Sequence, residues 1–240
     1  VNAGATLALL SAAKEASVGR FVYVSTSEVY GTAVEVPMTE SHVTVPMTVY
    51  GASKLAGESY ARAFHRTHGF PAVVIRPFNS FGPRCHHEGD SGEVIPKFML
   101  RALAGEPLLV FGDGTQTRDF TYVEDTARGI LAAGFAGDAV GETINIGSGR
   151  EISVNDLASA VAAVCGKQAV IRHDEPRPGD VLRLYADAGR ARKLLGFEPK
   201  IPLAEGLLRL KDWYTGADRS PQELLKEEVA HNWKPAGRRG

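Results

Sequence analysis

Two short, nearly continuous apolar runs, each following a stretch of helical periodicity, constrain the fold of this chain more than any other feature. Residues 20–25 (RFVYVS) and 72–76 (AVVIR) have the composition of strands that are buried on both faces. Residues 2–17 and 49–68, which precede them, space their apolar side chains as helices do. Helix therefore alternates with strand, which predicts an α/β fold with a Rossmann-like, doubly wound parallel sheet and ligands beyond the carboxyl ends of its strands.

The middle of the chain predicts a second, smaller lobe. Pro77 ends the second strand, and a polar loop then precedes a helix over 93–104 and short strands within 108–123. A helix over about 123–135 and a strand over 142–146 return to the Rossmann pattern. The chain therefore leaves the sheet, builds a lobe and comes back.

Capping residues complete the expected elements. Ser153 is expected to cap a helix that ends near Val164, and Asp187 a short helix that ends before Gly196. We predict a Rossmann domain and a smaller α/β substrate-binding lobe, followed by a polar tail that we expect to fray. The predicted bounds are 1–78 and about 121–147 for the Rossmann domain, 79–120 and 148–215 for the lobe, and 216–240 for the tail.

Composition excludes several classes of protein. The 27 basic and 28 acidic residues leave a formal net charge of -1, which gives no reason to expect nucleic acid or a membrane surface as partner. The sequence has no run of about 18 apolar residues, so it predicts no membrane-spanning helix. Cys85 and Cys165 are too few for a disulfide framework and lack the spacing of a zinc ribbon, which favours a cytoplasmic protein with two free thiols.

The spacing of Tyr50 and Lys54 indicates chemistry at the start of the helix over 49–68. Residues four apart lie on one face of a helix, so the phenol and the ammonium can act together. A lysine charge beside a phenol favours the phenolate, so we expect Lys54 to lower the pKa of Tyr50 and let it take a proton from a substrate hydroxyl. The pattern alone is a weak signal, but here it follows a strand that ends in Ser-Thr-Ser-Glu at 25–28.

Seven short motifs follow one another along the chain. They are Asn2, Ser25 to Gly31 (STSEVYG), Tyr50 with Lys54, Arg76 to Arg84 (RPFNSFGPR), Arg118 to Val123 (RDFTYV), Asn145 to Gly147 (NIG) and Arg177 to Asp180 (RPGD). Over about residues 2–214 the chain thereby resembles the NAD-dependent epimerase/dehydratase family, the extended short-chain dehydrogenase/reductases that act on nucleotide sugars.

The resemblance implies an enzyme that binds NAD and a nucleoside-diphosphate sugar. Tyr50 would take the proton of the sugar 4-hydroxyl, Thr26 would hydrogen-bond that hydroxyl, and Lys54 would also hold the nicotinamide ribose. The product of this step is a 4-keto sugar. The cofactor-binding residues that the resemblance implies are Asn2, Ser25, Tyr50, Lys54 and Phe78.

For the substrate, the resemblance implies that Asn79 meets the diphosphate. The other substrate-binding residues are Ser27, Arg118, Asn145, Arg177 and Asp180. A planar guanidinium suits phosphate oxygens, but each arginine could equally form a surface ion pair with Asp119 or Asp180. Phe78 could likewise pack between the lobes instead of lining the cofactor.

Oxidation at C4 leaves three reactions open. A 4,6-dehydratase removes the C5 proton and expels the C6 hydroxyl, a 4-epimerase returns hydride to the other face, and a uronate decarboxylase loses CO2. Glu28 favours the dehydratase or the decarboxylase, because it resembles the C5 base of such enzymes, although it could also form a structural ion pair. Ser27 stands where other dehydratases carry an aspartate, so the dehydratase ranks only slightly ahead of the epimerase, with the decarboxylase third.

One departure from the family concerns the cofactor loop. The glycine-rich turn that cradles a dinucleotide has no match here, and Gly147-Ser148-Gly149 follows a late strand without a third glycine. We therefore expect that the chain, which begins with Val1 inside a helix, is N-terminally truncated and binds NAD weakly or not at all by itself. A non-catalytic nucleotide-sugar-binding module stays open as a function of a different class.

Two groups of histidines are expected to have no functional role. The run Cys85 to Asp90 (CHHEGD) could suggest a metal site, but adjacent histidines cannot share one face as a ligand pair, so we predict a solvated loop and no metal. His65 and His68 are expected to be ordinary surface residues. The resemblance also implies a homodimer through the helix that bears Tyr50.

Overall fold

The computed structural model describes residues 2–89 and 92–231 and divides into two compact units. The first unit consists of 1–80, 118–151 and 181–200, and the second consists of 81–117, 152–180 and 201–240. Each unit is described by itself below.

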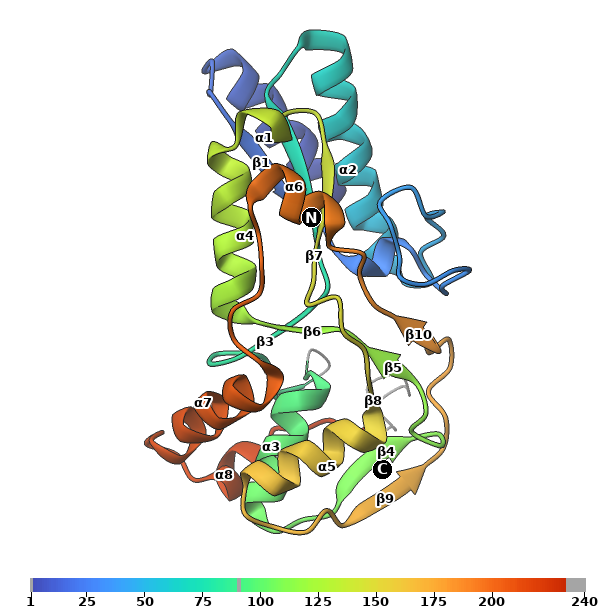
Figure 1. Ribbon diagram of the computed structural model, residues 1–240, viewed down its shortest axis with the longest axis vertical. Coiled ribbons are helices and arrows are strands. Elements are labelled where there is room, and N and C mark those ends of the chain that lie inside the picture. The colour runs from blue at the N-terminus through green and yellow to red at the C-terminus, as the bar shows by residue number, and fades with distance from the viewer. Residues whose placement is uncertain (1, 90–91, 232–240) are drawn as a thin grey trace, which may run out of the picture. The chain divides into compact units, whose positions relative to one another are not determined.

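The first unit contains a three-stranded parallel sheet in the order β1-β2-β7 (Figure 1). The strands are β1 (Phe21–Val24), β2 (Ala72–Pro77) and β7 (Thr143–Ile146). The register pairs Phe21 with Ala72 and Ile75 with Ile144. Each strand follows a helix, as the alternating pattern of the sequence predicted, and the parallel, Rossmann-like fold is confirmed.

Helices cover both faces of this sheet. Side chains of β2 alternate between two apolar cores, because successive residues of a strand point to opposite faces. Val74 packs with Leu10 of α1 (Asn2–Glu15) and Ala61 of α2 (Val49–His68). Val73 and Ile75 pack instead with Ala133 of α4 (Val123–Phe135) and Ala191 of α6 (Gly189–Leu195).

The ends of α2 are determined by local chemistry. Thr48, the N-cap, accepts a hydrogen bond from the Gly51 amide at 3.0 Å, which satisfies one of the free donors of the first turn. Gly69 ends the helix with a φ of 61°, a left-handed conformation that glycine adopts without strain. The 20 residues between them form the longest helix described.

The second unit packs four helices with a pair of parallel strands, β4 (Leu108–Phe111) and β9 (Ile171–Asp174). The helices are α3 (Val94–Ala104), α5 (Val154–Val164), α7 (Leu203–Thr215) and α8 (Pro221–Leu225). Their inward side chains, such as Phe98, Leu157 and Leu210, are almost completely buried. The expected cap of α5 is confirmed, since Ser153 Oγ accepts a hydrogen bond from the Asp156 amide at 3.0 Å.

Short elements occupy the remaining segments. They are β3 (Asn79–Phe81), β5 (Thr117–Arg118), β6 (Phe120–Tyr122), β8 (Ile152–Ser153), β10 (Arg183–Leu184) and the two 3₁₀ turns η1 (Ser27–Val29) and η2 (Gly137–Ala139).

Residues 181–200 belong to the first unit, whereas the sequence analysis had placed them in the smaller lobe. Backbone pairing explains this. The Met38 amide donates to Tyr185 O at 2.9 Å, and the Asp187 amide donates to Met38 O at 2.9 Å. The N-cap of α6 is Ala188 and not Asp187 as expected, although Asp187 Oδ1 accepts from the Gly189 amide, the first of the helix, at 2.7 Å.

The segment after Thr215 does not fray as the sequence analysis expected, at least as far as His231. Ser220 and Glu223 form a reciprocal capping box at the start of α8, and Leu224 is 7% exposed. Arg101 Nη2 lies 2.8 Å from Glu228 Oε2, which fixes the chain beyond α8 to α3. Residues 232–240 of the predicted tail lie outside the described residues.

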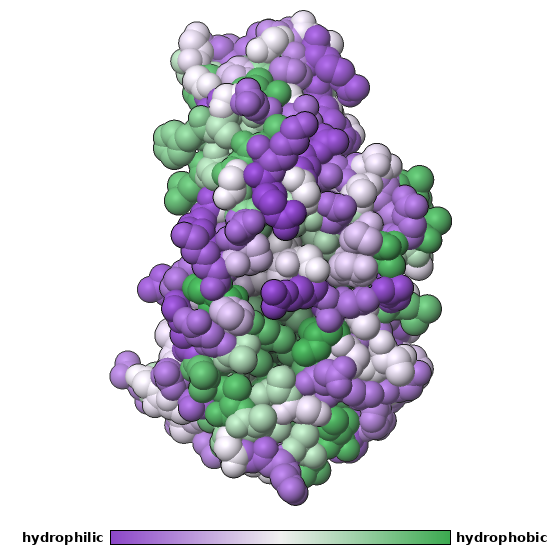
Figure 2. All heavy atoms as spheres, in the orientation of Figure 1, coloured by the Kyte–Doolittle hydropathy of each residue, from purple (hydrophilic) through white to green (hydrophobic). Residues whose placement is uncertain are grey.

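Within the described ranges, every helix is too short or too polar to cross a membrane. Polar side chains cover much of the face of the first unit that Figure 2 shows. Leu131 and Phe135 of α4 are exceptions, with exposed fractions of 62% and 85%.

The close packing of α2 on β1 should make Gly57 intolerant of any side chain. A Cβ there would lie 2.2 Å from the Tyr23 phenol oxygen. Alanine favours a helix over glycine by about 1 kcal/mol, but overpacking costs about 1–3 kcal/mol, so Gly57→Ala should lower the free energy of unfolding. Gly4→Ala in α1 is the matched control, because nothing lies within 4 Å of its Cβ position. Denaturant midpoints that rise for both variants would contradict this close packing.

Candidate active site

Two polar side chains of α2, one helical turn apart, meet the residues that end β1. Lys54 Nζ donates a hydrogen bond to the Val24 carbonyl at 2.9 Å. The Thr26 side chain, just beyond the strand, lies close enough to the Tyr50 phenol to lower its pKa. The structure therefore brings together Thr26, Tyr50 and Lys54, the three residues to which the resemblance gave catalytic roles, at the carboxyl end of a sheet strand.

The electrostatics of Tyr50 differ from the sequence expectation. Its side chain is 47% exposed, and partial burial raises the pKa of its phenol. The charge of Glu28 raises the pKa further, and the hydrogen bond with Thr26 opposes both effects. We had expected Lys54 to lower this pKa, but its ammonium lies 5.8 Å from the ring centroid and is directed to the Val24 carbonyl.

Lys54 is itself perturbed by its surroundings. Burial lowers the pKa of its ammonium, because removal from water disfavours the charged form. The ammonium also lies 5.6 Å from the centroid of the Tyr23 ring. Among the described residues Lys54 gives one N–H to Val24, and an ammonium carries three donors.

Glu28 lies on η1, which packs against the first turn of α2. Its Oε2 accepts a hydrogen bond from Thr48 Oγ1 at 2.8 Å, so the N-cap of α2 also orients this carboxylate. A Cβ at Gly51 would lie 2.9 Å from the Glu28 carbonyl oxygen, which shows how closely the two elements approach. The side chain of Glu28 is exposed, and its charge raises the pKa of the neighbouring phenol. A carboxylate and a phenol thus face the same region.

The residues that precede Glu28 build the turn η1 at the end of β1. Thr26 is the N-cap of η1, and its Oγ1 accepts from the Glu28 amide at 3.3 Å. Ser27, predicted to bind substrate, is only 4% exposed. Ser25, predicted to bind the cofactor, is also buried, and its Oγ donates to Glu58 Oε1 at 2.6 Å.

Of the other predicted cofactor residues, Asn2 lies beside the site and Phe78 lies in the core. Asn2 Nδ2 donates to Ser53 Oγ on α2 at 3.0 Å. Phe78 is 1% exposed and packs with Tyr30, Val29 and Met38, so its ring is an interior side chain rather than a lining one. The sequence could not separate these cases, since an aromatic residue after a strand suits either position.

Asn145, predicted to hold the nucleotide, is completely buried and committed to other groups. Its Oδ1 accepts from the Tyr30 hydroxyl at 2.6 Å, and its Nδ2 donates to the Met38 carbonyl at 2.9 Å. The side chain joins β7 to the segments after β1, so the structure gives it a structural role. This corrects the sequence prediction.

The remaining substrate residues lie in different parts of the chain. Asn79 Nδ2 donates to the Asp119 carbonyl at 3.0 Å, and Arg118 Nη1 donates to the Val181 carbonyl at 2.6 Å. Both belong to the first unit. Arg177 and Asp180 are exposed residues of the second unit, where Gln116 Nε2 donates to Asp180 Oδ2 at 3.4 Å. Their assignment to the substrate stays a prediction.

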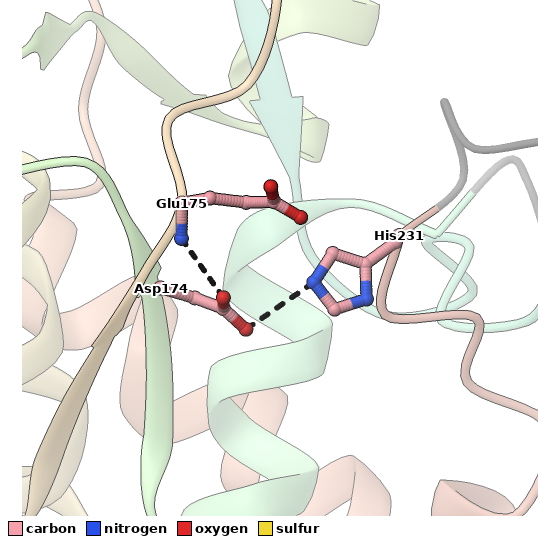
Figure 3. A group of neighbouring side chains, drawn as sticks. All are labelled: Asp174, Glu175 and His231. Atoms are coloured by element: carbon pink, nitrogen blue, oxygen red, sulfur yellow. Dashed lines mark hydrogen bonds and ion pairs between the residues drawn. The ribbon is translucent and has the colours of Figure 1, made fainter.

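Two histidine-containing clusters lie in the second unit. In the run that begins at Cys85, His86 Nδ1 lies 2.7 Å from Glu88 Oε1, and Asp90 lies outside the described residues. Figure 3 shows the other cluster, in which His231 Nε2 lies 3.2 Å from Asp174 Oδ2 and Glu175 is the neighbouring carboxylate. The Glu175 amide donates to the other Asp174 oxygen at 2.8 Å, so hydrogen bonds account for this carboxylate and we assign no metal to it.

Thr48 and Glu58 belong to the site but to none of the motifs that the sequence shows. Thr48 precedes the helical pattern and is a preferred N-cap type, which is a usable signal. Glu58 continues the spacing of Tyr50 and Lys54 by four more residues, which placed it on the same face. Its burial could not be predicted, because a glutamate in a helix is usually exposed.

Comparison with known proteins agrees with this geometry. Residues 1–147 match the NAD dependent epimerase/dehydratase family. The chain is 37% identical over 240 residues to a dTDP-glucose 4,6-dehydratase of Streptomyces niveus, with 99% of this chain and 70% of the relative covered. It is 34% identical to a putative UDP-glucose 4-epimerase of Methanocaldococcus jannaschii, with 92% of this chain and 71% of the relative covered.

Solved structures give the same result. A UDP-glucose 4-epimerase of Thermotoga maritima with UDP-glucose superposes with a TM-score of 0.85 at 35% identity, covering 89% of this chain and 69% of that one. A dTDP-glucose 4,6-dehydratase of Streptomyces venezuelae with NAD bound gives 0.82 at 36% identity, covering 89% of this chain and 65% of that one. The chain therefore belongs to the NAD-dependent epimerase/dehydratase family, whose members are enzymes with NAD as cofactor.

The surroundings of Tyr50 predict how its titration responds to substitution. Glu28→Gln should lower the pKa of the phenol, because it removes a negative charge that disfavours the phenolate. Thr26→Val should raise it, because it removes the hydrogen bond that stabilises the phenolate. The tyrosinate absorbance of each variant, less that of its Tyr50→Phe counterpart, measures both shifts.

Glu15→Gln at the end of α1 is the control for charge, and it should leave the titration of Tyr50 unchanged. Shifts in the opposite directions would show that the phenol is not between these two groups.

Proposed function

We propose that this protein is an NAD-dependent nucleotide-sugar 4,6-dehydratase that first oxidises the sugar at C4. One observation carries the choice of dehydratase: Thr48, the N-cap of α2, holds the Glu28 carboxylate at 2.8 Å beside the first turn that carries Tyr50, and the charge of Glu28 raises the pKa of the phenol. A dehydratase needs a base for the C5 proton next to the base that acts at C4, whereas a 4-epimerase does not break the bond from C5 to hydrogen.

The residues of the first unit fit the nicotinamide half of the cofactor. Lys54, Tyr50 and Asn2 offer an ammonium, a phenol and an amide near one strand end, which are donors of the kind that ribose hydroxyls and a carboxamide accept. When bound, NAD would accept hydride from C4 and later return it to the sugar, and its oxidised nicotinamide ring would carry a positive charge. Phe78 and the Ser25 side chain are not included, because the core contains them.

The proton steps belong to the side chains around η1. Tyr50 takes the proton of the C4 hydroxyl, and Thr26, whose side chain lowers the pKa of the phenol, hydrogen-bonds the same oxygen. The carbonyl that forms at C4 acidifies the hydrogen at C5, and Glu28 removes it. The C6 hydroxyl then leaves with a proton as water, and the C5–C6 double bond that forms takes up the hydride at C6 and a proton at C5, which gives the 4-keto-6-deoxy product.

A 4-epimerase is the second candidate, and Ser27 favours it. A dehydratase is helped by an acid that protonates the leaving hydroxyl, and Ser27 is a buried hydroxyl at that position in the turn. A uronate decarboxylase ranks third, since Glu28 is also compatible with it. A binding module without turnover ranks last, because Thr26, Tyr50 and Lys54 lie together.

The rest of the assignment follows from the same proposal. The first unit holds the cofactor, and Asn79 and Arg118 supply hydrogen-bond donors for the diphosphate and the nucleotide. Arg177 and Asp180, in the exposed loop after β9, are the substrate-binding candidates of the second unit. We further propose a homodimer and a cytoplasmic location, the latter on the two free thiols, Cys85 and Cys165.

Tyr50→Phe tests the shared first step. The substitution removes the ionisable hydroxyl and keeps the ring, so turnover should fall by about 10²–10⁴-fold, the usual contribution of a general base. The free energy of unfolding should change little, because the side chain is half exposed. The assay uses protein expressed from its full coding sequence with UDP-, dTDP- and GDP-hexoses. Near-normal turnover by this variant would contradict the proposed chemistry.

Exchange with D2O separates the dehydratase from the epimerase. A dehydratase should place deuterium at C5 of a 4-keto-6-deoxy product that has lost one water, and Glu28→Gln should suppress both changes while reduction of NAD stays detectable. Glu35→Gln, at an exposed carboxylate of the following loop, is the matched control and should behave as the parent. A product of unchanged mass without deuterium, detected by mass spectrometry, would assign the epimerase and leave Glu28 a structural role.

A further inference from the structure

Glu58 continues the polar face of α2 by one more turn and is completely buried. Its Oε1 accepts from Ser25 Oγ at 2.6 Å and from Arg76 Nε at 2.9 Å. Its Oε2 accepts from Arg76 Nη2 at 2.7 Å and from Arg62 Nη1 at 3.0 Å. One carboxylate therefore joins α2 to the end of β1 and to β2.

This carboxylate makes one of three contacts between the polar face of α2 and the residues at the end of β1. Lys54 holds the carbonyl of Val24, Glu58 holds the hydroxyl of Ser25, and the side chain next along the chain, Thr26, meets Tyr50. Three successive residues of the chain are thus bound by three side chains spaced four apart on one helical face. A shift of Ser25 moves Thr26 with it, because the two residues share a peptide unit.

The network continues from Glu58 to the far end of η1. The Arg76 guanidinium lies over the Tyr30 ring, 4.6 Å from its centroid. The Tyr30 hydroxyl in turn donates to Asn145 Oδ1 on β7 at 2.6 Å. The turn that carries Thr26 and Glu28 is therefore held at both of its ends, by Ser25 before it and by Tyr30 after it.

We propose that Glu58 is a positioning residue for catalysis, which through Ser25 fixes the Thr26 hydroxyl against the Tyr50 phenol. The proposal rests on the proposed C4 oxidation by Tyr50. It assigns Glu58 no contact with substrate or cofactor. Its effect on the reaction passes through the backbone of residues 25 and 26.

Charge neutralisation by itself does not explain the bond to Ser25. The two guanidinium groups of Arg76 and Arg62 already supply three hydrogen bonds to the carboxylate. A buried ion pair is in general a weak source of stability, because desolvation offsets the attraction. The bond to Ser25 does place the strand end relative to the helix, and a catalytic group displaced by about 1 Å can lose about 10²-fold in rate.

Ser25→Ala is the primary test, because it removes the bond to the strand and leaves the charged pair intact. We expect kcat to fall by about tenfold or more with the KM for the nucleotide sugar unchanged. Thr26 lowers the pKa of Tyr50, so its displacement should also move the rising limb of the pH profile of kcat to higher pH. Glu28, Lys54 and Tyr23, the other groups around the phenol, are untouched by the substitution.

Ser59→Ala is the matched control, since Ser59 is an exposed serine of the same helix that bonds Leu55 O. It should leave kcat and the pH profile unchanged. A second variant, Glu58→Met with Arg76→Met, replaces the buried pair by apolar side chains and leaves neither charge unpaired. We expect it to retain the fold by circular dichroism and to repeat the loss of kcat and the shift in pH profile.

The outcomes are distinguishable. Normal kcat in Ser25→Ala, or a loss of kcat without a shift of the pH profile, would overturn the positioning role. A weaker affinity for NAD with unchanged kcat would assign the Ser25 hydroxyl to the cofactor and also overturn it. If Tyr50→Phe in the same assay keeps near-normal turnover, the proposed function itself fails, whatever Ser25→Ala does.

Discussion

Helix α2 lies so close to the end of β1 that glycine is required at its points of contact. At Gly57 the Tyr23 ring occupies the space of a side chain, and at Gly51 the carbonyl of Glu28 does so. At both points a side chain would collide with a neighbouring group, which limits α2 to one close approach to β1 and η1. From that position the polar face of the helix meets the residues at the end of β1.

The same contact explains why a charged network lies inside the first unit. Packing α2 tightly over β1 and β2 buries Glu58 completely, and an isolated buried carboxylate is costly. Arg76, on the central strand of the sheet, compensates that charge, and its planar guanidinium stacks on the Tyr30 ring. The polar interior is therefore a consequence of backbone proximity, and it orders the turn on which the candidate catalytic groups lie.

Local patterns in the sequence predicted the parts of the structure that depend on local interactions. The apolar runs of β1 and β2, the cap at Ser153 and the shared face of Tyr50 and Lys54 all follow from periodicity or capping, and all are present. The predicted direction of the Tyr50 pKa shift was wrong. The pKa depends on the burial of the phenol and on the charge of Glu28, which the turn η1 places near it.

The other wrong predictions concern residues whose partners lie far away in the sequence. Asn145 is a polar residue at a strand end, where ligand-binding residues often lie. Its side-chain amide is hydrogen-bonded instead to Tyr30 and Met38, which lie more than 100 residues earlier. Residues 181–200 pair by backbone with Met38, which lies far earlier in the sequence. A short window of the sequence does not contain such long-range pairs. The sequence therefore predicted which residue types form the candidate site, but only some of the contacts that they make.

The order of the chain beyond Thr215 has a practical consequence for the design of shortened versions of the protein. A boundary drawn at the last strong hydrophobic helix, α7, removes Glu228 from Arg101, which is only 15% exposed, and removes the Val229 carbonyl from Lys97. It also removes Leu224, one of the buried apolar residues. A shortened version of the protein therefore needs the residues up to His231, and an affinity tag joined at Thr215 would replace part of the fold.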